Sequence, residues 1–461
     1  MSTKPALTLS SLWRSDIAPT LALGLPLAGA QLAQMAINTT DIIMVGWLGP
    51  VELGAVVLAN NLYILFWFFG MGMTQAIIPL AAQALGRKAP RDLRRTVRMG
   101  LWAVALYCLP VWTVLWFTRD ILILLGQTPE LADLAAGYMR IMQWTMLPSL
   151  AIMATRAFVT VMNRPQIVLW ATIGGAVLNA ILNYVLIFGH FGFPRLELQG
   201  AAIASFCTQM LAFSILAAYV VTQPRLRRFN VFGRLWRSDW PVFFQILRMG
   251  SPIGLTIVAE GFLFTGSTMM MGWVGTLPLA AHGIALQIAS ITFMVPLGIS
   301  QAGMTRVGLA AGQRDLDGIA RAGWTALWLT LGFMTLAAIA FWTIPGPIVS
   351  LFLDFDNPAS AEVLAIAVSL LGVAAVFQIA DGAQVAGGSI LRGLGDTMTP
   401  LLYALVGYMA IGMTLSYVLA FPLGLGGVGI WWGLAGGLAS TAIMAIWRFA
   451  RRKEAGLLPA V

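Results

Sequence analysis

Residues 18–45 read APTLALGLPLAGAQLAQMAINTTDIIMV and contain one charged side chain, Asp41. A helix of about 20 apolar residues is long enough to cross the hydrocarbon core of a bilayer. The same criterion predicts twelve spans, at 18–45, 54–83, 99–117, 138–160, 166–189, 199–222, 249–273, 279–305, 322–344, 363–390, 400–421 and 427–448. The spans must be helices, because an open sheet would leave backbone groups without hydrogen bonds in lipid.

The composition excludes the soluble classes of protein. Hydrophobic residues make up 59% of the chain and charged residues 10%, whereas a soluble domain has about 25% charged residues. We therefore predict an all-α polytopic membrane protein. The two cysteines, Cys108 and Cys207, lie in apolar runs, which favours packed side chains over a disulfide framework or a metal site.

Positive charges gather in alternate loops. They follow the second, sixth, eighth and twelfth spans, at Arg87, Lys88, Arg91, Arg94, Arg95, Arg98, Arg225, Arg227, Arg228, Arg234, Arg237, Arg314, Arg321, Arg448, Arg451, Arg452 and Lys453. The other loops hold Arg119, Arg140 and Arg195 but mostly acids, at Glu52, Asp120, Glu130, Asp133, Asp354, Asp356 and Glu362. The positive-inside rule then predicts that both termini are cytoplasmic. The net charge of +9 is therefore a topology signal, with some attraction to anionic lipid. Membrane lipid is expected as a partner, and nucleic acid is not.

The two halves of the sequence resemble each other. A shift of 226 residues places Pro26 on Pro252 and Gln75 on Gln301, with no gap between them. A duplicated six-helix unit is typical of transporters, in which the site lies near mid-membrane between the repeats. We predict two pseudo-symmetric six-helix bundles, divided as an N-terminal lobe, a cytoplasmic linker and a C-terminal lobe at 1–224, 225–247 and 248–461.

Three carboxylates, Asp41, Glu260 and Asp381, lie well inside the predicted spans. A charge at mid-bilayer costs at least about 2.5 kcal/mol, so it usually faces a cavity or a partner. No Lys or Arg within the spans is placed where it would obviously neutralise them. We interpret the three acids as candidate cation-binding groups. Because a proton and Na⁺ compete for the same oxygens, this reasoning does not select the ion.

Polar residues on other spans could complete such sites. Asn179 and Asn183 are four residues apart on one helix face, and their amide oxygens suit a hard cation. Ser205 is a weaker candidate of the same kind. The structural alternative is that these groups only join membrane helices. On the first span, Pro26 predicts a helix kink about four turns before Asp41. Either the bend of this helix changes with the charge of Asp41, or the kink is static.

Motifs for other chemistries are absent from the sequence. It contains no GxxxxGK[ST] phosphate-binding loop, so no ATPase motor is expected in this chain. It also lacks HExxH and GxSxG, and His190 and His282 are isolated, so neither a metalloenzyme nor a hydrolase is expected. We predict a secondary active transporter, not an enzyme, with no cofactor and no metal site. A channel stays open as an alternative.

The chain resembles the multidrug and toxic compound extrusion (MATE) transporters, and among them the NorM branch. The resemblance rests on the twelve spans in two halves, the Pro26 to Asp41 helix followed by MVGWLG, and the stretches LNAILNY and LRGLGDTMTP. It implies two bundles around a central cavity and rocker-switch alternating access. It also implies export of cationic, lipophilic drugs and dyes in exchange for Na⁺ or H⁺. We expect a monomer in the inner membrane of a bacterium, with no ATPase subunit.

The resemblance also assigns site residues. It matches the carboxylate and polar positions of the family's N lobe to Asp41, Asn179, Asn183 and Ser205, and the carboxylates of its C lobe to Glu260 and Asp381. Two departures leave the coupling ion open. Phe377 stands where NorM relatives can carry Tyr, so one oxygen ligand is missing, and some relatives carry Asp at the position of Asn183.

The alternative within the same wider superfamily is a flippase for a lipid-linked or polysaccharide precursor. Such substrates carry phosphate, so their cavity should contain Arg or Lys. Arg156 and Arg392 lie near the predicted cytoplasmic ends of their helices. The charges deep in the spans are acidic instead, which argues against this alternative.

Overall fold

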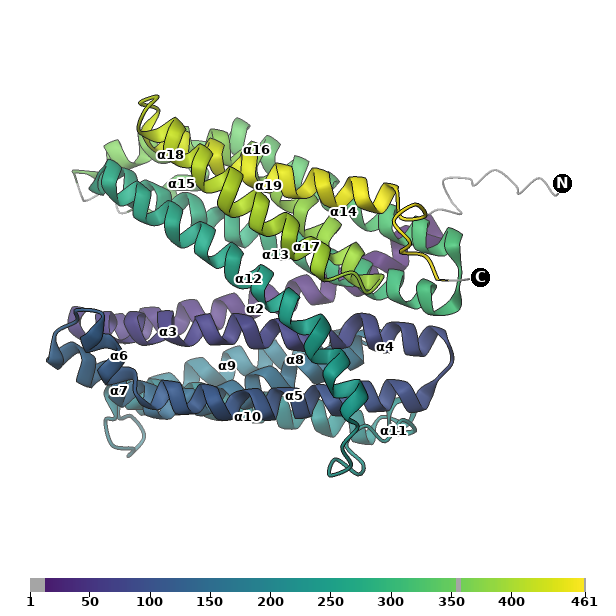
Figure 1. Ribbon diagram of the computed structural model, residues 1–461. Helices are drawn as coiled ribbons and strands as arrows, with labels where there is room; N and C mark the ends of the chain where they lie inside the picture. The colour runs from purple at the N-terminus through teal and green to yellow at the C-terminus, as the bar shows by residue number, and fades with distance from the viewer. Residues whose placement is uncertain (1–12, 354–357, 460–461) are drawn as a thin grey trace. The chain divides into compact units, whose positions relative to one another are not determined.

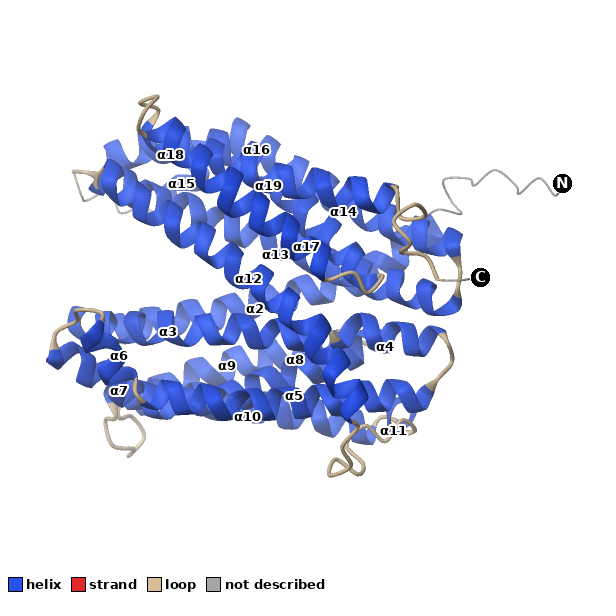
Figure 2. Cartoon of the chain, in the orientation of Figure 1, coloured by secondary structure: helices blue, strands red, loops and turns tan. Residues whose placement is uncertain are grey.

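The structure is a computed structural model that describes residues 13–353 and 358–459. Within these ranges every regular element is helical and no strand occurs (Figure 2). Twelve of the helical segments are long and apolar enough to cross a membrane, which confirms the predicted all-α architecture. Asp354 and Asp356, two of the acids used to predict the topology, lie outside the described residues.

Several helices extend beyond the predicted spans. The third span was predicted at 99–117, whereas the helix covers Pro90–Trp116, and the eighth was predicted at 279–305, whereas the helix covers Thr276–Gln313. Apolar composition marks only the part that suits the lipid core, while the helix continues into polar turns on either side. Pro90 begins its helix at a position where its missing N–H costs no hydrogen bond.

The chain forms two compact units, which we call the N-unit and the C-unit. The N-unit is residues 29–254, and the C-unit consists of the described parts of 1–28 and 255–461. Helices α2 (Ala18–Gly46) and α12 (Trp240–Val274) each contribute to both units. The changeover lies after Ala28 in α2 and after Gly254 in α12. Each point is two residues beyond a proline, Pro26 or Pro252, that the internal repeat aligns. The lobe boundaries at 224 and 248 stay a prediction.

The N-unit is built from α-helices (Figure 1), and buried residues from several of them form a shared apolar core. The helix α10 packs against α7, α8 and α9, and α3 packs against α5, α7 and α8. The remaining bounds are α3 (Pro50–Gln75), α4 (Ile77–Gly86), α5 (Pro90–Trp116), α6 (Thr118–Leu124), α7 (Pro129–Met142), α8 (Met146–Val161), α9 (Gln166–Phe188), α10 (Glu197–Thr222) and α11 (Pro224–Arg227).

In the C-unit, α16 is the central helix and packs against α13, α14 and α19. The apolar core of the C-unit includes the fully buried Phe377, Tyr408 and Trp431. A π-helical segment at Leu405–Met413 joins α17 and α18. The bounds are α13 (Thr276–Gln313), α14 (Leu316–Thr343), α15 (Pro345–Ser350), α16 (Ser360–Gly393), α17 (Met398–Ala404), α18 (Thr414–Ala420) and α19 (Gly426–Ala450).

Small residues allow α18 and α19 to approach closely. A Cβ atom on Gly433 would overlap the backbone of Ser416, and one on Gly429 would overlap the backbone of Leu419. In lipid, helices associate through such close packing, because burial of apolar surface gives little driving force there. Side chains at these positions would separate α18 from α19.

Candidate functional site

The structure brings the four predicted N-lobe residues together inside the N-unit. Asp41 lies on α2, Asn179 and Asn183 lie one turn apart on α9, and Ser205 lies on α10. The two asparagines are fully buried and Ser205 is 7% exposed. Because α9 and α10 pack along each other, their polar residues reach the same carboxylate.

Neutral groups hold both oxygens of the Asp41 carboxylate. The Asn183 amide Nδ2 donates to Asp41 Oδ1 at 2.5 Å and also to Asn179 Oδ1 at 3.2 Å. The Ser205 hydroxyl donates to Asp41 Oδ2 at 3.2 Å. Hydrogen bonds to an ionised group are stronger than those between neutral groups, so the three residues fix the orientation of the carboxylate. They do not neutralise its charge.

The cluster leaves hydrogen-bonding capacity unused. Among the described residues, the buried Asn179 Nδ2 and Asn183 Oδ1 have no hydrogen-bond partner. A buried polar group without a partner costs about 1–3 kcal/mol. Asn183 Oδ1 is a free amide oxygen next to a carboxylate, and this pair of oxygen types suits a hard cation.

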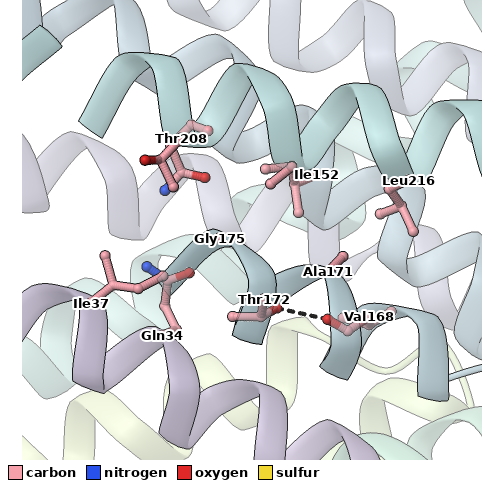
Figure 3. A pocket seen from close by; sticks show the side chains of 11 residues that line it. Gln34, Ile37, Ile152, Val168, Ala171, Thr172, Gly175, Thr208 and Leu216 are labelled. Atoms are coloured by element: carbon pink, nitrogen blue, oxygen red, sulfur yellow. Dashed lines mark hydrogen bonds between the residues drawn. The ribbon is translucent and has the colours of Figure 1, made fainter. Parts of the chain in front are cut away.

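A cavity of about 30 Å³ lies within the N-unit. Gly175 and Thr208 line it (Figure 3), and each is a single turn from Asn179 or Ser205 in sequence. This volume exceeds what one water molecule requires. Thr208 Oγ1 is buried and, in the described part of the chain, has no hydrogen-bond partner. Gln34, the repeat counterpart of Glu260, also lines the cavity.

The C-unit holds a second polar cluster, centred on Asp381 of α16. Gln378 and Gln384 lie three residues before and after Asp381, and all three side chains are buried. Gln384 Nε2 donates to the Tyr408 hydroxyl at 2.5 Å, and Gln378 Nε2 donates to the Thr292 hydroxyl. Within the described residues, Asp381 Oδ1 and both glutamine side-chain oxygens have no hydrogen-bond partner.

Glu260 belongs to this second cluster. It interacts electrostatically with Asp381 and with Arg392. Arg392 is only 8% exposed, and its charge acts on Glu260, but within the described residues it forms no ion pair or hydrogen bond with either acid. The helix α16 continues to Gly393, and a long Arg side chain can place its charge a turn or more from its Cα atom.

The aromatic side chain of Phe377 lies one turn before Asp381 on α16. It is 2% exposed, and its ring packs edge-on against Trp431 at 5.2 Å and Phe264 at 6.1 Å between centroids. It therefore contributes no oxygen to the Asp381 cluster. Pro26 lies within the continuous helix α2, so the predicted kink stays a prediction.

The structure thus separates the predicted site residues into two clusters, one per unit. In the described residues there is no group of three or more His, Cys, Asp or Glu side chains that could hold a metal ion. The sequence did not identify Arg392 and Tyr408 as neighbours of the C-unit acids, or Thr208 as part of the cavity wall. The only feature that marks these residues in the sequence is a polar side chain inside an apolar run, and many packed side chains share this feature.

The MatE family model matches the chain twice, at residues 26–185 and 252–418, so each half of the sequence contains one match. The probable multidrug resistance protein NorM of Rhizobium meliloti (strain 1021) is 47% identical over 439 residues, which cover 95% of this chain and 94% of the relative. The probable NorM protein of Agrobacterium fabrum (strain C58 / ATCC 33970) is 42% identical over 440 residues, with 95% of each chain covered.

Solved structures show the same fold at much lower sequence identity. The eukaryotic MATE transporter AtDTX14 superposes with a TM-score of 0.83 at 19% identity, covering 97% of this chain and 100% of that chain. An outward-facing multidrug resistance MATE family transporter superposes with a TM-score of 0.86 at 19% identity, covering 99% of each chain. The two matches of the family model begin at Pro26 and Pro252 and cover more than half of the sequence. The chain therefore belongs to the MatE family of transporters.

Proposed function

We propose that this transporter exports cationic, lipophilic drugs and dyes in exchange for Na⁺ or H⁺. The observation that carries the proposal is the surrounding of Asp41, whose hydrogen-bond donors Asn183 and Ser205 are both neutral. A buried carboxylate without a cationic partner is stabilised when a proton binds to it or when a metal cation or a cationic drug binds beside it. The relatives' name, multidrug resistance protein, supports a drug as the exported substrate.

The exchange follows from competition for one negative charge. In the outward-open state, Asp41, Glu260 or Asp381 takes up Na⁺ or H⁺. Loading neutralises the acid, displaces the cationic drug and favours return to the inward-open state. Such coupling requires the two ligands to differ in affinity between the two states. We propose that a rocker-switch movement interconverts the two states. We also propose that the protein lies in a bacterial inner membrane with both termini cytoplasmic.

Dye efflux from proteoliposomes that contain the purified chain tests this proposal, and we propose that the chain works as a monomer. A cationic dye is loaded, and an inward Na⁺ gradient and a pH gradient are imposed separately. Efflux driven by one of the gradients, without ATP, is the expected result, and the effective gradient identifies the ion. Dependence on ATP, or no efflux under either gradient, would overturn the proposal.

The runner-up is a flippase for a lipid-linked precursor. Arg392 favours it, because it is a buried cation that could meet a phosphate. In the C-unit, however, Glu260 and Asp381 accompany Arg392, so the cluster as a whole is negative when all three groups are ionised. The same liposomes decide between the two functions. Translocation of a fluorescent phospholipid with no dye efflux would favour the flippase.

A further inference from the structure

One end of the N-unit concentrates positive charge. The segments 87–98 and 225–239 together contain eleven Lys and Arg residues and two acids, Asp92 and Asp239. Segment 87–98 includes the first turns of α5, and 225–239 precedes α12. We call this region the basic end. A cluster of this kind attracts anions, but the charges alone do not define a site.

The segment before α12 is fastened to α5 at three points. The Trp102 indole Nε1 donates to the Leu235 carbonyl at 2.7 Å. The Asp239 backbone N–H lies 3.2 Å from Met99 Sδ, and the Asp239 carboxylate pairs with Arg95 Nε at 3.0 Å. Asp239, one of the two acids of the basic end, is therefore already engaged by Arg95.

Arg94 and Arg98 are left without such partners. They lie one turn apart on α5, and Arg98 is only 4% exposed. The Nε atoms of both side chains are buried and form no hydrogen bond within the described residues. Most of the charged groups that act on Arg98 have its own sign, since they are Arg94, Arg95, Arg237 and the single acid Asp239.

A buried guanidinium surrounded mainly by other cations is costly unless an anion accompanies it. The guanidinium group has five N–H donors in a fixed plane, which match the oxygens of a phosphate or carboxylate. Residues four apart on a helix have Cβ atoms about 5–6 Å apart, so two such groups can hold one tetrahedral anion. Nearby, Trp102 and Trp240 form an edge-to-face pair with centroids 6.5 Å apart, and Trp240 is half exposed.

We propose that Arg94 and Arg98 bind a phosphate group at the basic end of the N-unit. The phosphate belongs either to the headgroup of an anionic phospholipid or to a soluble phosphate ester. Trp side chains concentrate at the depth of lipid headgroups, so the Trp102 and Trp240 pair places the two arginines where a headgroup phosphate would lie. This inference does not rest on the exported substrate or on the coupling ion.

Equilibrium binding to the delipidated full-length chain in detergent tests the proposal. The probes are phosphatidylglycerol, phosphatidylcholine and glycerol 3-phosphate. Arg98→Gln and Arg94→Gln should each weaken binding of the phosphate probe about tenfold, because each removes a charge-assisted contact. The matched control is Arg91→Gln, since Arg91 is exposed on the same helix, and it should change affinity less than about twofold.

The probes also separate the two sources of phosphate. Tight binding of phosphatidylglycerol that glycerol 3-phosphate does not displace supports a lipid site, and tight binding of glycerol 3-phosphate itself supports a soluble ester. Arg98→Lys keeps the charge and serves as the folding control, and Arg94→Gln decides if Arg98→Gln does not fold. Wild-type affinity in both glutamine variants, or an equal loss in Arg91→Gln, would overturn the proposal.

Discussion

The N-unit and the C-unit place their acids in opposite kinds of surroundings. In the N-unit, Asp41 is held by amide and hydroxyl groups that carry no charge. In the C-unit, Glu260 interacts electrostatically with a second acid, Asp381, and with a buried cation, Arg392. When all these groups are ionised, each cluster carries one net negative charge. The duplicated halves have reached the same net charge with different residues.

The internal repeat explains how the two clusters diverged. Gln34 stands where the second half has Glu260, and Ser267 stands where the first half has Asp41. The acids of the two clusters are therefore not repeat copies of each other. A single carboxylate with neutral partners is neutralised by one cation, whereas in the acid pair the charge of Glu260 is already partly compensated by the charge of Arg392. We expect the N-unit cluster to depend more strongly on a bound cation.

The largest effect is expected for Asp41→Asn. The amide keeps the shape of the side chain but removes the charge that a cation would neutralise, so gradient-driven dye efflux should fall to the rate of protein-free liposomes. Because no cation loses its partner, the melting temperature should stay near that of the wild type. Efflux at the wild-type rate would show that Asp41 is not the coupling group, and would make Asp381→Asn the decisive variant.

The sequence predicted the fold and the N-unit cluster better than the C-unit cluster. Apolar runs gave twelve spans, and the four-residue spacing of Asn179 and Asn183 placed both on one face of α9, where they meet Asp41. The sequence did not predict that the charge of Arg392 acts on Glu260, because the distance of Arg392 from the end of a span does not say where its long side chain places the charge. The contact between Gln384 and Tyr408 joins α16 to another segment, and no local pattern predicts such a pairing.

The next largest effect is expected on stability, for Arg392→Gln. It removes the positive charge that acts on the buried Glu260, and a buried charge is costly when no opposite charge accompanies it. Thermal unfolding in detergent should show a lower melting temperature than for Asp41→Asn. The double variant Glu260→Gln/Arg392→Gln should recover most of the loss. If Arg392→Gln melts like the wild type, the two clusters do not differ in charge compensation.

A smaller effect is expected for Asn183→Ala. This substitution removes the donor 2.5 Å from Asp41 Oδ1 and the free amide oxygen beside it. Hydrogen bonds to charged groups contribute about 1.5–3 kcal/mol, so coupled efflux should fall about tenfold or more. Ile181→Ala is the matched control, because Ile181 lies on the same helix and is 54% exposed. Equal efflux rates in Asn183→Ala and Ile181→Ala would show that Asn183 does not contribute to cation binding.

The smallest effect is expected for Ser205→Ala. The Ser205 hydroxyl contacts Asp41 Oδ2 at 3.2 Å, a longer bond than the one from Asn183, and it supplies no oxygen that is left without a partner. Because this bond is long, its loss should cost less than about 1.5 kcal/mol, the lower end of the range for hydrogen bonds to charged groups, so we expect the efflux rate to fall only about twofold. The control on the same helix is Ser214→Ala, whose exposed hydroxyl bonds only its own helix at the Met210 carbonyl. A loss as large as that of Asn183→Ala would mean that Ser205 binds the cation directly, and that the N-unit cluster is a closed oxygen cage rather than a carboxylate oriented by an amide.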